Sequence, residues 1–167
     1  MKRCDWARNT DRLLCEYHDK EFGRKKNSDA ALFEKLCLEM FQAGLSWRTV
    51  LDKREAFREV FYGFDAVRVA MMTETDAAVL MADRRIIRNR RKIDAVIHNA
   101  QKFCEQFGCE GSFVKYVYGF DGGDALCRDL RRRGFQFVGP TICESFLGSV
   151  GAIEAHEPGC DLYRGRG

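Results

Sequence analysis

The chain has 167 residues, the length of one ordinary domain, and 46% of them are hydrophobic, which is too many for a disordered chain. Its net charge of +3 is too small to identify a partner, and its 2 prolines argue against a meander of short strands. No apolar run resembles a signal peptide or approaches the roughly 20 residues of a membrane span, so we expect a cytoplasmic protein with no membrane partner. In that compartment its 8 cysteines indicate buried thiols or metal ligands rather than disulfides.

Apolar residues recur at spacings of three and four through most of the chain, which predicts an all-α protein. Ser28 or Asp29 suits the start of one helix, and Ser46, Asp65 and Thr73 suit three more starts, because each side chain can accept a backbone N–H. The expected helices cover residues from about 30 to 42, 46 to 61, 65 to 72, 73 to 81, 93 to 107, 124 to 133 and 140 to 150. The two ends of the chain lack a strong helical period. We therefore expect a single helical domain over residues 1–167.

A basic stretch precedes the longest of these helices. Residues 84–92 hold six cations, and three arginines follow at residues 131–133. Such a run is typical of solvated helix ends. It is equally typical of an edge that binds phosphate groups, and the residues alone leave both interpretations open.

Two cysteines and two histidines near the ends of the chain form a candidate metal site, namely Cys4, His18, His156 and Cys160. Thiolate and imidazole are the ligands of closed, tetrahedral zinc sites. The histidines could also be ordinary surface residues, because a His-x-x-x-Cys spacing alone is a weak pattern. A zinc ion would hold together two segments that otherwise lack a regular period.

Several motifs follow one another along essentially the whole chain, at residues 3–6, 16–19, 38–39, 42–47, 86–90, 92–93, 133–135, 137–139 and 141–143. Together they resemble the bacterial DNA-3-methyladenine glycosylase I family. The resemblance implies a single-domain, helix-hairpin-helix DNA glycosylase fold with a structural zinc site that ties the termini together. The zinc ligands of the family fall on Cys4, His18, His156 and Cys160.

The resemblance also implies a reaction, the hydrolysis of the N-glycosidic bond of 3-methyladenine in alkylated double-stranded DNA. The base pocket of the family falls on Glu39, Tyr17 and Trp47. To these we add Phe22, which stands where a tryptophan is familiar. Aromatic rings would replace the stacking that a flipped base loses, although Tyr17 and Trp47 are by default core residues. A buried Glu39 would accept from the exocyclic amine and offset the charge of the methylated base, whereas most helix glutamates are solvated.

The same resemblance predicts the parts that hold the DNA. A hairpin over about residues 83–92 would bind a phosphate through backbone amides, and the turn at residues 42–45 would fill the gap left by the flipped nucleotide. The expected DNA contacts are Gln42, Gly44, Leu45, Arg88, Arg90 and Lys92. We assign no lysine as a Schiff-base nucleophile, which predicts base removal without strand cleavage. We expect the protein to act as a monomer.

The chain departs from the family pattern at Met40 and Phe41, at Arg85 and Arg91 where glycine is expected, at Glu144 where tyrosine is usual, and in a shortened stretch over residues 118–125. These changes leave the expected fold intact, but they leave open which alkylated bases the pocket accepts. An alternative function is therefore a non-catalytic or altered-specificity DNA-binding member of the same fold. A small helical zinc protein that binds a protein partner is a third interpretation, which the basic stretch disfavours. Steep salt dependence of binding would favour the DNA interpretations.

Overall fold

Helices make up all the regular secondary structure of the computed structural model, which describes residues 1–8 and 11–165. Within these residues there are nine α-helices, two short 3-10 helices and no strand, as predicted. The elements are η1 (Asp5–Ala7), α1 (Arg12–Lys20), α2 (Asp29–Gln42), α3 (Trp47–Val60), η2 (Tyr62–Phe64), α4 (Ala66–Ala70), α5 (Glu74–Ala82), α6 (Arg90–Gln106), α7 (Ser112–Val117), α8 (Gly123–Arg132) and α9 (Pro140–Ser149).

Local side-chain caps explain where the predicted helices begin. The N-caps of α2, α3, α4 and α5 are Ser28, Ser46, Asp65 and Thr73, and each accepts a hydrogen bond from a backbone N–H of the first turn. Pro140 occupies the first turn of α9, where its missing N–H breaks no helical hydrogen bond. These five starts are confirmed.

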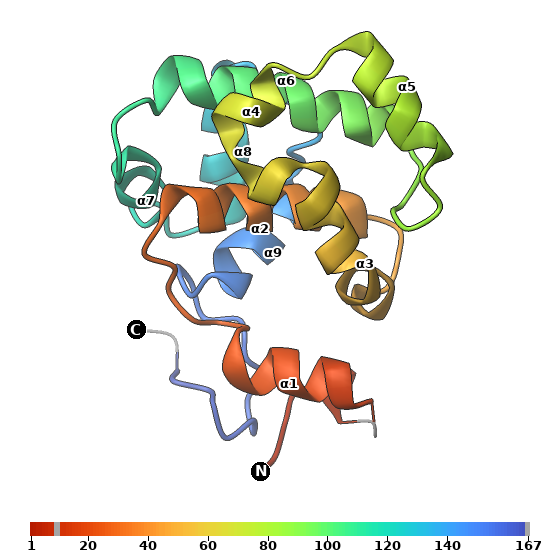
Figure 1. Cartoon of the computed structure of the whole chain (residues 1–167). Coiled ribbons are helices and arrows are strands. Elements are labelled where there is room, and N and C mark those ends of the chain that lie inside the picture. The colour runs from red at the N-terminus through yellow and green to blue at the C-terminus, as the bar shows by residue number, and fades with distance from the viewer. Residues whose placement is uncertain (9–10, 166–167) are drawn as a thin grey trace.

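Helix α2 runs through the middle of the molecule and contacts α3, α6, α7 and α9 (Figure 1). Met40 and Phe41, which depart from the family pattern, are both fully buried on this helix. The Phe41 ring packs against Phe57 of α3 with ring centroids 4.5 Å apart. The departure at these two positions therefore affects the core and not the lining of a cavity.

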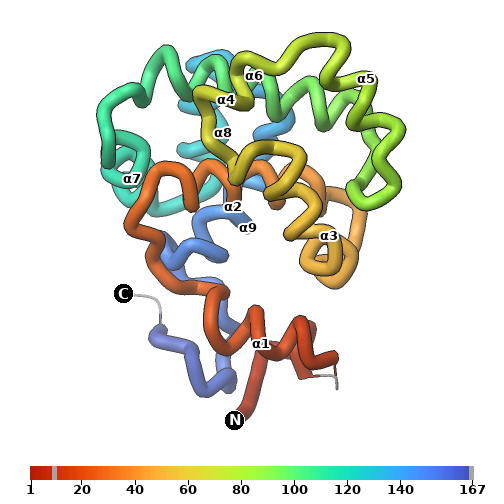
Figure 2. The backbone as a smooth tube through the Cα atoms, viewed as in Figure 1, coloured from red at the N-terminus to blue at the C-terminus, as the bar shows by residue number. Residues whose placement is uncertain are grey.

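The two ends of the chain lie together on one side of this helical body. Figure 2 shows α1 beside the segment that follows α9, with the N-terminus near them. The contact is a direct hydrogen-bonded one, because the Asp161 amide donates to the Lys2 carbonyl at 3.0 Å. The Lys2 amide in turn donates to the Asp161 carboxylate at 2.9 Å. The ends are thus fixed to each other rather than frayed.

Two α-helices were not predicted. Helix α1 lies in the N-terminal segment for which no helical period was expected, and Asp11 caps it by accepting from the amides of Leu13 and Leu14. Its apolar stripe is narrow, because Leu14 and Tyr17 are the buried apolar residues of its nine. Helix α7 has only six residues, too few to display a period. Short helices of this kind depend on tertiary packing.

Among the described residues, no helix is long and apolar enough to cross a membrane.

Candidate active site and metal centre

The four predicted metal ligands lie together at the junction of the two ends. Cys4, His18, His156 and Cys160 are all buried, and their ligand atoms lie within 4.8 Å of one another. Cys4 Sγ is 3.6 Å from His156 Nδ1, and Cys160 Sγ is 3.5 Å from His18 Nε2. Tetrahedral zinc with ordinary bond lengths places sulfur and nitrogen ligands about 3.5 Å apart. The donor set and its spacing therefore fit a zinc ion.

Three of the four ligands also have an outer hydrogen-bond partner. His18 Nδ1 lies 2.9 Å from an Asp19 carboxylate oxygen, and this leaves Nε2 facing the cluster. Arg3 makes two hydrogen bonds to Asp19 at 2.8 Å, and mainly for this reason the pKa of Asp19 falls to about 2. On the sulfur side, backbone amides of residues 157 and 162 donate to Cys4 and Cys160 at 3.3 and 3.4 Å. Such outer hydrogen bonds are typical of a structural metal site.

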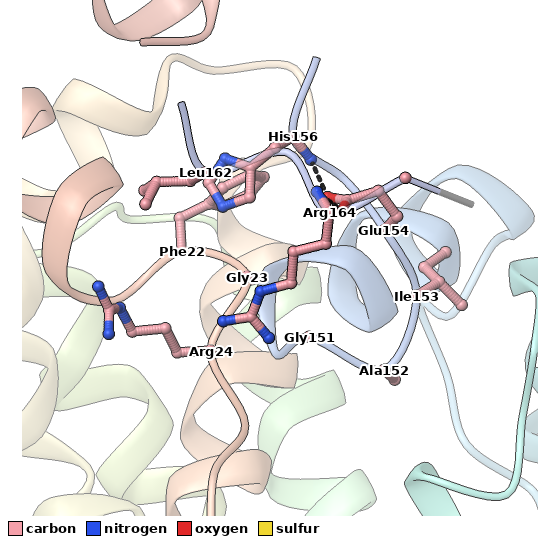
Figure 3. Close-up of a pocket in the computed structure, with 11 residues that line it drawn as sticks. Phe22, Gly23, Arg24, Gly151, Ala152, Ile153, Glu154, His156, Leu162 and Arg164 are labelled. Atoms are coloured by element: carbon pink, nitrogen blue, oxygen red, sulfur yellow. Dashed lines mark hydrogen bonds between the residues drawn. The ribbon is translucent and has the colours of Figure 1, made fainter. Parts of the chain in front are cut away.

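The chain around His156 is shaped by a close backbone approach. Figure 3 shows a cavity beside His156, between residues 22–24 and the C-terminal segment. The His156 amide donates to Glu154 at 2.8 Å, which holds this loop. A Cβ at Gly23 would come within 2.7 Å of the His156 ring, and Gly23 has a φ of +71°. Only glycine satisfies both conditions, so Gly23 is needed for the cluster to close.

A second, larger cavity shares Phe22, Ile153 and Glu154 with the first. It has a volume of about 490 Å³, within the usual range for small-molecule sites, and Trp6, Phe22, Glu39, Gln42 and Trp47 are among its lining residues. Three of the four predicted base-pocket residues, Phe22, Glu39 and Trp47, thus share one cavity. Trp6, which sequence reasoning did not assign to the pocket, lines it as well and meets Phe22 edge-on with centroids 5.0 Å apart.

Tyr17 lies behind this wall instead of in it. Its ring stacks on Trp47 with centroids 5.3 Å apart and an interplanar angle of 22°, and it does not line the larger cavity. Tyr17 thus supports the indole, and the predicted pair of aromatic residues is present as a stack. Burial raises the pKa of the Tyr17 hydroxyl, so this group is neutral and able to donate at neutral pH.

Glu39 is the most unusual group in the cavity. Only 1% of the residue is exposed, and neither carboxylate oxygen has a hydrogen-bond partner within the described part of the chain. Burial raises the pKa of Glu39, because the charged form loses its hydration. A buried carboxylate without partners costs free energy unless a ligand supplies them. The structure therefore places an acceptor, already desolvated, at the wall of an aromatic cavity.

Lys35 was not among the predicted site residues, yet it lies one helical turn before Glu39 and is also buried. Its ammonium is 3.7 Å from Glu39 and 3.8 Å from the centroid of the Trp47 ring, and it donates to the Tyr17 hydroxyl. The i to i+4 spacing of Lys35 and Glu39 on α2 was a visible signal. Burial of both side chains was not, because it depends on α1, α3 and α9.

The predicted DNA-facing turn follows α2. Gln42 closes it by donating to the Leu45 carbonyl at 2.7 Å, and Gly44 adopts a φ of +79°. Leu45 is 41% exposed, an exposure that suits an apolar wedge. Lys92 stabilises the turn from inside by donating to the carbonyls of residues 41 and 43 at 3.1 and 2.8 Å.

The three predicted cations have different environments. Arg88 is exposed, whereas Arg90 pairs with Glu74 and Asp94. Lys92 is 7% exposed and its ammonium donates to carbonyls at the end of α2, so its predicted contact with DNA stays a prediction. Helical phase explains this burial, because the first turn of α6 points Lys92 at the turn that follows α2.

The other departures from the family pattern also have structural explanations. The loop between α5 and α6 lies where the hairpin was expected, and in it Arg85 pairs with Asp83 at 2.8 Å and with Glu59 at 2.6 Å. Arg85 and Arg91 are both absent from the positive-φ residues, so neither position requires glycine here. Glu144 accepts from the Gly123 amide at 2.6 Å at the start of α8. Glu144 is also among the residues that line the larger cavity.

An all-helical fold with an aromatic cavity over a buried carboxylate is the class of structure that the resemblance predicts. A sequence profile of the methyladenine glycosylase family matches residues 6–126 and 120–164. The chain is 41% identical over 185 residues to DNA-3-methyladenine glycosylase 1 of Escherichia coli (strain K12), covering 99% of this chain and 98% of that protein. The chain therefore belongs to the methyladenine glycosylase family.

Solved structures agree with this assignment. A crystal structure of 3-methyladenine DNA glycosylase I has a TM-score of 0.89 and 40% identity, and the match covers 97% of this chain and 100% of that one. A variant of a 3-methyladenine DNA glycosylase I in complex with 3-methyladenine has a TM-score of 0.88 and 33% identity, with 100% of both chains covered. The predicted fold class and family are confirmed.

Proposed function

We propose that this protein is a DNA glycosylase that hydrolyses the N-glycosidic bond of 3-methyladenine in alkylated double-stranded DNA. The observation that carries the proposal is Glu39, a desolvated carboxylate without hydrogen-bond partners at the wall of an aromatic cavity. Membership of the methyladenine glycosylase family supports the same reaction.

The chemistry of the damaged base matches the cavity. Methylation at N3 gives the base a positive charge in DNA, and departure from the sugar neutralises it, so the base is already a good leaving group. Trp47 and Phe22 offer flat surfaces to a flipped base. Glu39 accepts from the exocyclic amine and favours the cationic base over neutral adenine. Water then completes the hydrolysis at the sugar carbon.

The surface beside the cavity suits a duplex. Leu45 enters the gap left by the flipped nucleotide, and Gln42 and Gly44 shape the turn that carries it. Arg88 and Arg90 lie at the start of α6, where the loop between α5 and α6 forms the hairpin and offers its amides to a phosphate. Arg90 must exchange its carboxylate partners for phosphate on binding. We infer that the fold is of the helix-hairpin-helix type and that the protein binds DNA as a monomer.

Zinc has a structural role in this proposal. The Cys4, His18, His156 and Cys160 cluster holds the ion and joins the termini, and the ion takes no part in the reaction. Lys35 does not line the base cavity, so base removal proceeds without a Schiff base and without strand cleavage. The reaction places the protein with the chromosome in the cytoplasm of a bacterium.

The decisive experiment incubates the protein with methylated duplex DNA and identifies the released bases by chromatography. We expect 3-methyladenine in the released fraction and an intact sugar–phosphate backbone. The Glu39→Gln variant should release it about tenfold to hundredfold more slowly, because a charged hydrogen bond is lost. A Glu105→Gln variant, which changes an exposed glutamate on α6, is the matched control and should match the unmodified protein.

Release of no base by folded, zinc-loaded protein would refute the enzymatic proposal. Release of other alkylated bases in place of 3-methyladenine would instead establish an altered specificity.

A further inference from the structure

The base cavity has a rear side as well as a front side. Behind Trp47 lies a second, smaller cavity of about 80 Å³, whose lining includes Tyr17, Lys35, Trp47, Arg54 and Ser149. Trp47 lines both cavities, so the indole separates the two. Whatever occupies the rear side therefore acts on the wall that a base would contact.

Lys35 is the group on that rear side. Its ammonium is held against the indole of Trp47 at 3.8 Å from the ring centroid and lies 4.5 Å from the Tyr17 centroid. It donates to the Tyr17 hydroxyl and lies 3.7 Å from a Glu39 oxygen. One side chain thus touches the carboxylate, the indole and the phenol of the proposed base site.

The surrounding charges do not replace Lys35. The titratable or polar groups that face the Lys35–Glu39 pair from other elements are Tyr17 of α1, Arg54 and Arg58 of α3, Ser149 of α9 and the loop residues Glu21 and Lys26; Glu144 of α9 and Glu154 line the base cavity with Glu39. Glu21 and Arg54 pair with each other at 2.8 Å, so their charges largely cancel. Ser149 donates its hydroxyl to the Phe146 carbonyl at 2.9 Å. Lys35 is therefore the cation that balances Glu39.

We propose that Lys35 is a positioning residue, whose ammonium keeps Glu39 ionised at neutral pH and holds Trp47 and Tyr17 in their stack. The proposal rests on the proposed function for its meaning, since it concerns the same base site. Burial alone raises the pKa of Glu39, and the nearby ammonium opposes that rise. Protonated Glu39 offers less negative charge to a cationic base. Without Lys35, Glu39 therefore becomes protonated at a higher pH, and activity is lost at that higher pH as the pH falls.

The test compares Lys35→Met, which keeps a long unbranched side chain and removes the charge, with Lys35→Arg, which keeps the charge. Single-turnover release of 3-methyladenine from methylated duplex DNA is measured from about pH 5.5 to 9. We expect the acidic limb of the pH–rate profile of Lys35→Met to move to a higher pH by about one unit or more. At a pH below the limb, this shift lowers the rate of release about tenfold. Lys35→Arg should retain the limb of the unmodified protein. Lys102→Met, a lysine on α6 paired with Glu105, is the control.

A second measurement needs no DNA and no active enzyme. The side-chain carboxyl ¹³C resonance of Glu39, assigned with Glu39→Gln, reports its ionisation against pH. We expect Glu39 to be ionised at pH 7 in the unmodified protein and protonated there in Lys35→Met. If the variant does not fold, the resonance of the unmodified protein still decides, since a protonated Glu39 at pH 7 overturns the proposal.

An unchanged pH profile together with an unchanged Glu39 resonance in folded Lys35→Met would also overturn it. Failure of the proposed function has a different signature, because the unmodified protein would then release no 3-methyladenine at any pH while the Glu39 resonance still depended on Lys35.

Discussion

The metal cluster and the base cavity treat buried polar groups in opposite ways. At the cluster, the ligand atoms of Cys4 and His18 lie close together, and each residue also has an outer partner. The Glu157 amide donates to Cys4 Sγ, and an Asp19 carboxylate oxygen lies beside His18 Nδ1. In the cavity, Glu39 is as deeply buried, but neither of its oxygens has a hydrogen-bond partner among the described residues. The closed site suits a permanent ion that contributes to folding, and the open one suits a ligand that comes and goes. Phe22 lies between the two, 5.1 Å from the His156 ring and 5.0 Å from the Trp6 ring.

The largest expected effect is at the closed site. Cys160→Ser should abolish stoichiometric zinc binding and lower the free energy of unfolding by several kcal/mol, because metal binding is folding free energy for the joined ends. Elemental analysis and thermal unfolding with and without a chelator measure both. Cys109→Ser, at an exposed cysteine, is the control and should change neither. Retention of zinc by Cys160→Ser would remove Cys160 from the ligand set.

A smaller effect should sharpen the idea that outer partners complete the closed site. Asp19→Asn removes the carboxylate that orients His18 while leaving all four ligands in place. We expect zinc affinity to fall by about tenfold to hundredfold, with the fold retained at saturating zinc. Competition with a chromogenic chelator measures the affinity. An unchanged affinity would show that the orientation of His18 does not depend on Asp19.

The smallest expected effect concerns the residue between the two regions. Phe22→Leu keeps an apolar side chain but removes the ring that faces Trp6 and the cavity. We expect release of 3-methyladenine to slow by about threefold to tenfold, the value of one aromatic contact, with full zinc content. Rapid-quench release assays and elemental analysis on the same sample measure both. Loss of zinc in this variant would mean that the two regions form one unit.

Much of the fold was predictable because its signals are local. A cap such as Ser28 or Thr73 acts within one turn, so the helix starts follow from a few neighbouring residues. Helix α1 escaped prediction because its apolar stripe is narrow, with Leu14 and Tyr17 as its buried apolar residues, and helix α7 because it has only six residues. They form because the rest of the molecule covers their apolar sides.

The site was predictable in part, and what the sequence did not reveal is the burial of two lysines. The four metal ligands came from their residue types and from the resemblance, Glu39 came from the resemblance, and the structure brings the ligands together. Lys92 was predicted to contact DNA because it belongs to a basic run, and Lys35 was overlooked because it looks like an ordinary helix lysine. Both are 7% exposed. Burial of a long cationic side chain depends on what packs over it, which neighbours in sequence do not reveal.

By itself, then, the sequence determined the helical class, most helix starts, the family and the residue types of both sites. Only the tertiary structure decided which polar groups are buried and whether they find partners. It joined Cys4 to residues more than 150 positions away, and it left Glu39 without a hydrogen-bond partner while placing Lys35 behind it. The reason is that periodicity and capping act over one or two turns, whereas desolvation and charge pairing depend on every element that closes around a side chain.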